Sequence, residues 1–148
     1  MLGRLLVTVA AVVGVGGFSW WWQRRDRRRR SPVHAPDRTG WPRQLHRGDF
    51  DDGSRPWLVV LFSSRTCGSC DRVRAAVQGL AAPDTRVVEV AYQDAPDLHR
   101  RYEVPGVPLV LIAGPDGVVE AGFLGPVTEA ELSEALGRAR LASPDPSR

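Results

Sequence analysis

The sequence predicts an α/β domain, with a mixed sheet of about five strands and helices on both faces, behind one N-terminal apolar segment. Three observations support this. The run 57–62 is continuously apolar, as in a central strand covered on both faces. A helical pattern and a valine-rich strand follow it, and this β-α-β order requires a parallel pair with a right-handed crossover. The turn at 115–117 then joins two apolar runs into an antiparallel hairpin.

The first half of the domain begins with a weak pattern. Residues 41–50 contain Leu45 and Phe50, which predict a short edge strand with little room for a helix after it. A helix follows the strand 57–62 over about 68–81. Its apolar positions have the spacing i, i+3, i+4, i+7 and are Val73, Ala76, Val77 and Leu80. The next strand is 86–92.

The second half has clearer helix signals. Asp94 is expected to cap a short helix with Pro96 in its first turn, and Leu98 and Tyr102 are expected to face inward. Strands 107–113 and 118–124 form the hairpin. A capping box of Thr128 and Glu131 opens the last helix, whose buried positions are expected to be Leu132, Ala135, Leu136 and Ala139. The domain spans 41–142, and 143–148 is a frayed tail.

The N-terminal segment has the composition of a membrane anchor. Residues 5–22 are uncharged, a length at the lower limit for a bilayer-spanning helix, and three tryptophans close the run. A cleavable signal peptide carries its charge before the apolar run and small residues after it, which is the reverse of this pattern. We therefore predict an uncleaved transmembrane helix over 1–23; a cleaved or interfacial segment is the alternative.

An arginine-rich segment follows the anchor. Six arginines lie within 24–30, and flanking basic residues remain on the cytoplasmic side of a membrane. A cytoplasmic domain on a single-pass cell-membrane anchor is the prediction, with an outward-facing domain as the alternative. The rest of 24–40 contains Pro32 and Pro36 and is interpreted as a tether. The arginine run is also expected to contact anionic lipid.

The charge of +3 is unevenly distributed. Eight arginines face two aspartates through residue 40, a net +6, whereas from Trp41 onward twelve arginines face fifteen acidic residues, a net −3. The domain is therefore mildly acidic, which argues against a nucleic-acid partner.

The two cysteines, Cys67 and Cys70, lie where the strand 57–62 passes into a helix. Residues three apart share a helix face, so the sulfurs can form a disulfide or remain a dithiol. Free N–H groups at a helix start stabilise a thiolate, and such settings lower a thiol pKa from about 8.5 to roughly 3.5–7.5. Cys67 is the predicted nucleophile and Cys70 the resolving residue. Arg65 and Arg72 can add positive charge, which Asp71 opposes. Inert buried cysteines or a metal site are the alternatives.

This arrangement resembles the thioredoxin family over roughly 48–141. The resemblance rests on a strand, a Cys-Gly-Ser-Cys motif, a helix, and Gly106-Val107-Pro108 before a later strand. It implies that Pro108 is cis and packs beside the cysteines, and that the Val107 backbone pairs with a substrate strand. With Gly68 and Ser69 between the cysteines, these residues form the expected substrate-binding set. No bound cofactor is implied.

Several positions depart from the family pattern. Leu61 replaces the family's buried acid, Thr66 its tryptophan, Gly68-Ser69 its Gly-Pro, and Ala75 its kinking proline. Gly122 is a candidate for the substrate groove, with a bulge as the alternative. Asp71 and Glu89 are expected to be solvated, and Tyr92 and Phe62 to belong to the core. The three histidines have no ligand spacing, so no metal site is predicted.

Three functions are compatible with these features. The first is a membrane-anchored thiol–disulfide oxidoreductase whose partners are protein disulfides or dithiols, membrane lipid and a membrane redox protein. The second has the same chemistry on the outer side, for cytochrome maturation or secreted disulfides. The third is a non-enzymatic binding module for a membrane partner, favoured by the loss of the buried acid at Leu61.

Overall fold

The computed structural model describes residues 40–51 and 53–143. The predicted anchor at 1–23, the arginine-rich segment and all of the tether except Gly40, and the tail beyond Ser143 lie outside the described residues. Among the residues that are described, no helix is both long and apolar enough to span a bilayer.

A four-stranded mixed sheet forms the centre of the domain, in the order β2-β1-β3-β4. The strands are β1 (Trp57–Ser63), β2 (Thr85–Ala91), β3 (Leu109–Ala113) and β4 (Val119–Leu124). The β1–β2 pair is parallel, and the β1–β3 and β3–β4 pairs are antiparallel. The predicted βαβ unit and hairpin are therefore confirmed.

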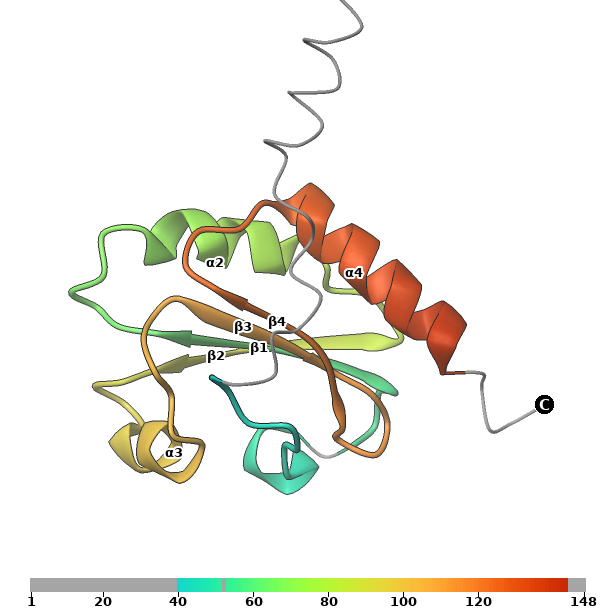
Figure 1. Ribbon diagram of the computed structural model, residues 1–148, viewed down its shortest axis with the longest axis horizontal. Coiled ribbons are helices and arrows are strands. Elements are labelled where there is room, and N and C mark those ends of the chain that lie inside the picture. The colour runs from blue at the N-terminus through green and yellow to red at the C-terminus, as the bar shows by residue number, and fades with distance from the viewer. Residues whose placement is uncertain (1–39, 52, 144–148) are drawn as a thin grey trace, which may run out of the picture. The chain divides into compact units, whose positions relative to one another are not determined.

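Helices cover both faces of this sheet (Figure 1). Helices α2 (Cys70–Gln78) and α4 (Glu129–Ala142) pack on one face. Helix α3 (Pro96–Arg101) and the short 3-10 turn η1 (Arg47–Asp49) lie on the other. All seven residues of β1 are buried because this strand has neighbours on both sides and cover on both faces.

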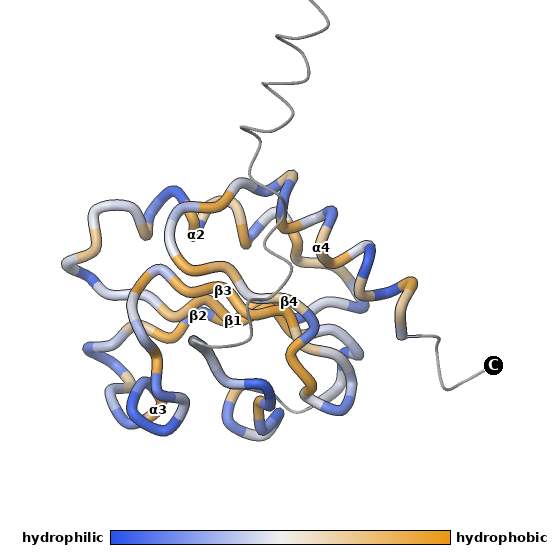
Figure 2. The backbone as a smooth tube through the Cα atoms, in the orientation of Figure 1, coloured by the Kyte–Doolittle hydropathy of each residue, from blue (hydrophilic) through white to orange (hydrophobic). Residues whose placement is uncertain are grey.

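Each face of the sheet has its own apolar core. The side chains of Val59 and Leu61 point towards α2 and α4, and those of Leu58, Val60 and Phe62 point towards α3 and η1. Figure 2 shows the hydrophobic colour concentrated along the strands, while hydrophobic and hydrophilic stretches alternate along the helices. The alternation along β1 thus divides one apolar run between two cores.

The predicted fifth strand is wrong. The 41–50 segment pairs with the sheet through a single bridge between Gln44 and Val118. Hydrogen bonds from Leu45 N to Gly117 O and from Val119 N to Arg43 O flank this bridge, both at 2.9 Å. Proline has no N–H to continue a ladder, and the residue before Pro42, Trp41, packs on β4 instead.

Two predicted helix starts are also wrong. Helix α2 begins at Cys70 rather than near residue 68, and its N-cap is Ser69. Helix α3 has Ala95 as its N-cap, because the Asp94 carboxylate pairs with Arg65 instead. Pro96 does occupy the first turn of α3, and Tyr102 is buried, but His99 lies deeper than Leu98.

The last helix agrees with its prediction. The Thr128 hydroxyl accepts a hydrogen bond from Glu131 N, and the Glu131 carboxylate accepts one from Thr128 N, which completes the capping box. The buried positions of α4 are the four expected ones: Leu132, Ala135, Leu136 and Ala139. The pKa of Glu131 is lowered because its carboxylate accepts hydrogen bonds from Thr128 N and from the Thr128 hydroxyl, which favour its charged form.

Candidate redox site

Cys67 and Cys70 form a disulfide whose Cα atoms are 5.5 Å apart. Cys70 is fully buried as the first residue of α2, whereas Cys67 is partly exposed in the turn before the helix. Cys67 is therefore the more accessible residue of the pair. This asymmetry suits a pair in which the outer cysteine meets a partner first.

The turn between the cysteines is tight. Cys67 N donates to Ser64 O at 3.1 Å, and Cys70 N donates to Cys67 O at 3.3 Å. Gly68 is exposed, with nothing near the position that a Cβ would occupy. The Ser69 hydroxyl makes no helix-capping hydrogen bond; it lies 3.7 Å from Cys67 Sγ.

The loop that carries Cys67 is fastened to the neighbouring β2–α3 connection. The Gln93 side chain donates to Ser64 Oγ at 2.9 Å, and its carbonyl accepts from Arg65 N at 3.1 Å. Arg65 and Asp94 add an exposed ion pair between the same two loops. The positive charge of Arg65 near Cys67 is therefore paired, and Arg72 is exposed on α2.

The Val107–Pro108 peptide bond is cis, as the family resemblance implies. Pro108 immediately precedes β3, whose first residue pairs with the end of β1, so the proline lies at the sheet end that carries Cys67. Pro108 O accepts from Gly125 N at 2.8 Å. Figure 1 shows the β1–α2, β2–α3 and α3–β3 connections gathered at this one end of the sheet.

Two exposed apolar side chains extend this end of the sheet. Tyr92 is 49% exposed and Leu124 is 53% exposed. Tyr92 follows the end of β2, where its N–H donates to Ser63 O, and Leu124 ends β4 opposite the first residue of β3. The prediction that Tyr92 belongs to the core is wrong. Tyr92 follows the last paired residue of β2 and continues the apolar pattern of that strand. The pattern alone therefore could not show that its side chain is exposed.

Glu89 is not the solvated charge that its position suggested. Its carboxylate receives two hydrogen bonds from Arg74, at 2.7 and 2.8 Å, and one from the buried Ser63 hydroxyl at 2.6 Å. Arg74 above all, and then Ser63, hold the pKa of Glu89 below its usual range despite partial burial. The other predicted solvated charge, Asp71, is exposed and pairs with Arg74.

Glu89 lies beside Leu61, the position at which the family has a buried acid. Leu61 is fully buried among apolar neighbours on the α2 face and pairs in register with Glu89 on β2. The carboxylate on this face is thus one strand away from Leu61 and is ion-paired. Phe62, on the opposite face, is a core residue as predicted.

Gly122 does not line the substrate end of the sheet. A Cβ at this position would lie 2.5 Å from Cε2 of the Trp41 ring, so the glycine allows the indole to pack on β4. The irregularity in the β3–β4 register lies at Ile112/Ala113, so the bulge alternative for Gly122 is also wrong.

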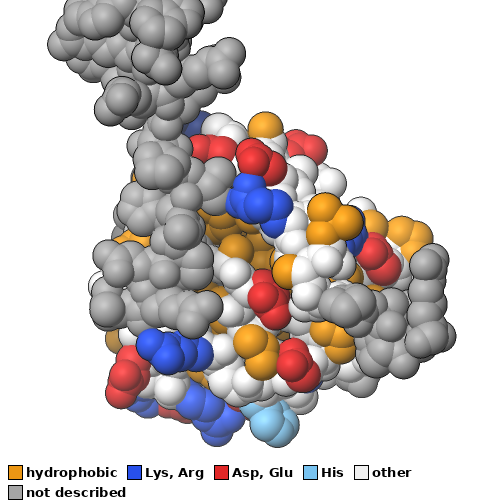
Figure 3. All heavy atoms as spheres, turned by 45° about the vertical axis from the view of Figure 1, so that its right-hand side comes forward, with side chains coloured by type: hydrophobic (Ala, Val, Ile, Leu, Met, Phe, Trp, Pro, Cys, Tyr) orange, Lys and Arg blue, Asp and Glu red, His pale blue; other side chains and the backbone are white. Residues whose placement is uncertain are grey.

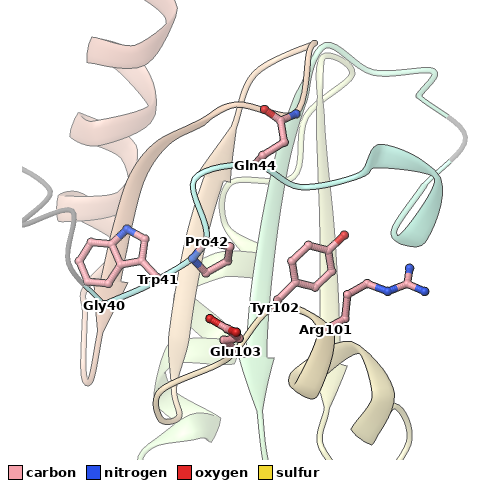
Figure 4. A pocket seen from close by; sticks show the side chains of 7 residues that line it. All are labelled: Gly40, Trp41, Pro42, Gln44, Arg101, Tyr102 and Glu103. Atoms are coloured by element: carbon pink, nitrogen blue, oxygen red, sulfur yellow. The ribbon is translucent and has the colours of Figure 1, made fainter.

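A hollow of about 420 Å³ lies beside Trp41, and neither cysteine lines it (Figure 4). Its lining residues come from the first described segment and the end of α3: Gly40, Trp41, Pro42, Gln44, Arg101, Tyr102 and Glu103. No predicted site residue contributes to it. On the face shown in Figure 3, acidic and basic side chains of the described residues are interspersed with apolar ones.

Within 40–51 and 53–143, no three His, Cys, Asp or Glu side chains are grouped as a metal site. His99 is buried and its Nε2 lies 2.9 Å from Val90 O, and its ring packs edge-on against Phe62 and Tyr92. His46 is exposed beside η1.

No protein-family model matches the sequence, and no curated protein matches it. Solved structures do match. A thioredoxin mutant from Halobacterium salinarum is 24% identical, with a TM-score of 0.55 over 64% of this chain and 85% of that one. A malarial protein is 15% identical, with a TM-score of 0.52 over 57% and 97%.

A third match comes from a study of thiol resolution in yeast mitochondrial 1-Cys peroxiredoxin via glutathione and thioredoxin systems. It is 24% identical, with a TM-score of 0.50 over 58% of this chain and 81% of that one. At these identities the matches establish the fold, and the Cys67–Cys70 disulfide comes from this chain's own residues. The chain is a divergent member of the thioredoxin-like fold with a Cys-Gly-Ser-Cys pair at the start of its helix α2.

Proposed function

We propose that this chain is a membrane-anchored thiol–disulfide oxidoreductase that exchanges electrons with protein disulfides or dithiols. The Cys67–Cys70 pair carries the proposal, because it joins a partly exposed cysteine to a buried one at a strand-to-helix turn. No cofactor is needed, since the dithiol itself carries the two electrons.

Each residue of the site has a task in this proposal. The Cys67 thiolate attacks a partner disulfide, and Cys70 then attacks Cys67 and releases the partner. Neither the N–H nor the C=O of Val107 has a hydrogen-bond partner among the described residues, so both can pair with an extended substrate strand. Gly68 and Ser69, together with the largely buried Pro108, complete the proposed contact surface.

A trapping experiment tests the chemistry. In the reduced full-length protein, Cys70→Ser should accumulate a mixed disulfide with a disulfide-containing protein, because no resolving thiol remains. Cys67→Ser is the matched control and should trap nothing, since Cys70 is buried. The wild-type protein should accelerate insulin reduction by dithiothreitol. Failure of both trapping and insulin reduction would contradict the proposed function.

The membrane part of the proposal rests on the uncharged run at 5–22 and the six arginines after it. They support a single-pass anchor with the domain in the cytoplasm. An impermeant thiol reagent on intact cells should therefore leave Cys67 unmodified. Rapid modification would instead support the outward-facing alternative, and replacing the six arginines by glutamine should disturb the orientation.

One observation favours a second candidate function. Leu61 is wholly buried in apolar surroundings, and the nearby Glu89 carboxylate is ion-paired with Arg74, so resolution by Cys70 has no free acid beside it. A slow pair would suit a binding module for a membrane partner. If Cys67→Ala preserves the protein's cellular role, the binding module is correct and the oxidoreductase is not.

A further inference from the structure

Ser69 occupies a helix-capping position without capping the helix. Serine is among the preferred N-cap residues because its hydroxyl accepts a hydrogen bond from an N–H in the first turn. In α2 the Ser69 side chain makes no such bond, and its backbone is helical, with φ −98° and ψ −12°. The hydroxyl is therefore available to another acceptor.

That acceptor is the outer sulfur of the redox pair. Ser69 Oγ lies 3.7 Å from Cys67 Sγ, within the range of a hydrogen bond to sulfur. A disulfide sulfur carries no hydrogen, so in the oxidised protein the hydroxyl is the donor. Ser69 is only partly exposed, which limits competition from water.

We propose that Ser69 is a catalytic residue whose hydroxyl donates to the Cys67 sulfur and stabilises the thiolate form of Cys67. This inference rests on the proposed oxidoreductase function and assigns one interaction within it. A hydrogen bond to the charged form of a group favours that form. Because the hydroxyl is already directed at the sulfur in the disulfide, little rearrangement is needed on reduction.

The interaction acts at defined steps of the exchange. When the Cys67 thiolate attacks a partner disulfide, a Cys67–partner bond forms and the partner's other sulfur leaves as a thiolate, which takes up a proton. The Cys70 thiolate then attacks Cys67, forming the Cys67–Cys70 bond and releasing the second partner thiolate. The protein dithiol is oxidised by two electrons and the partner disulfide is reduced.

Stabilising the thiolate also biases the direction of exchange. Disulfides whose reduced form is stabilised are the stronger oxidants. Ser69 therefore shifts this pair towards accepting electrons from partner dithiols. Its loss should make the protein a stronger reductant.

The test removes the Ser69 hydroxyl from the full-length protein. In a Cys70→Ala background, where only Cys67 titrates, Ser69→Ala should raise the midpoint of thiolate absorbance by about half to one pH unit. With both cysteines present, the same change should shift the equilibrium with glutathione about threefold to tenfold towards the oxidised protein. A tenfold shift corresponds to about 30 mV.

Two controls make the test specific. Ser69→Thr keeps a hydroxyl and should restore the wild-type midpoint. Thr66→Val removes a hydroxyl from the same loop whose partner is Ser64 Oγ rather than a sulfur, and should leave the midpoint unchanged.

Two results would overturn the inference while the proposed function stands. The first is that Ser69→Ala leaves both the thiolate titration and the glutathione equilibrium unchanged. The second is that Ser69→Ala destabilises the oxidised and reduced proteins equally without changing the titration, which would identify Ser69 as a helix cap. A wild-type pair that does not exchange with glutathione would instead contradict the proposed function itself.

Discussion

At the scale of single residues, Glu89 shows the largest difference between the site in the structure and the site that the sequence predicts. Arg74 and Ser63 join this carboxylate to the first turns of α2 and to the end of β1, the two segments that carry the cysteines. Because Glu89 is partly buried and accepts hydrogen bonds from both Arg74 and Ser63, we expect this contact to stabilise the fold more than an exposed ion pair does. Its role is to hold α2 against the sheet behind the redox turn.

Glu89→Gln should therefore destabilise the protein by about 1 kcal/mol at pH 7, a value limited by the partial exposure of Arg74. The folded-state pKa of Glu89 is lowered, so its contribution is present above the unfolded-state value of about 4.3 and is lost as the pH falls through the folded-state value. Urea unfolding of wild type and variant at pH 7 and pH 3 measures this, and the difference should shrink at pH 3.

The control for Glu89 is Asp71→Asn, which removes the other carboxylate on Arg74. The Asp71 side chain is 86% exposed, so this change should cost close to nothing. Equal effects of the two variants would show that Glu89 is no more than a surface charge.

Gly122 is a second residue whose role is steric. Gly122→Ala would place a Cβ against the rigid Trp41 ring, and we expect a loss of about 1–3 kcal/mol. Gly137→Ala is the matched control, because it lies in α4 with nothing near the added atom and should stabilise the helix by up to about 1 kcal/mol. Thermal unfolding of both variants tests this, and a neutral Gly122→Ala would contradict the close packing.

At the scale of elements, the connection between β1 and α2 depends on its neighbour. Gln93 holds the loop at both Ser64 Oγ and Arg65 N, so the segment before Cys67 is ordered by a side chain from the β2–α3 loop. Periodicity could predict the strand and the helix on either side. It could not predict these contacts of Gln93, because no sequence pattern indicates which group a side-chain amide in a loop will bind.

Gln93→Ala should therefore speed amide hydrogen exchange at Arg65 by several-fold, with a loss of about 1 kcal/mol in stability from the two hydrogen bonds. Asp94→Ala removes the exposed ion pair between the same loops and should change both quantities little. NMR exchange rates on the oxidised protein provide the measurement. A larger effect from Asp94→Ala would show that charge, not the amide, orders the loop.

Helix and strand boundaries show where sequence reasoning fails for physical reasons. The start of α2 could not be predicted from apolar spacing, since the turn closed by Cys70 N and Cys67 O contains only Gly68 and Ser69. By contrast, Thr128 and Glu131 form a local reciprocal cap, and the start of α4 was correctly predicted.

At the scale of the whole molecule, Arg47 connects segments that lie far apart in the sequence. Its side chain is only 13% exposed, and the guanidinium donates to the Asp51 carboxylate, to Pro56 O at 3.0 Å and to Gly114 O at 3.1 Å. One side chain thus connects η1, the approach to β1 and the β3–β4 turn. The sequence predicted the paired strands from their apolar runs, but an arginine that donates to carbonyls far away in the sequence has no such pattern around it.

Arg47→Met should cost about 3–5 kcal/mol, because it leaves the Asp51 carboxylate, itself 3% exposed, buried without its cation. The double variant Arg47→Met with Asp51→Ala should recover part of this loss, since the unpaired charge is then absent. Denaturant unfolding of the four proteins in the cycle measures the coupling. Additive effects would contradict a central role for this cation.

Because nothing lies near the position that a Cβ would occupy at Gly68, this residue between the cysteines is open to exchange. A Cβ introduced there meets neither α2 nor the two cores. A library randomised at this one codon, with Ser69 kept, should yield proteins of nearly uniform fold whose affinities for electrons differ, so one scaffold can be tuned for different redox compartments.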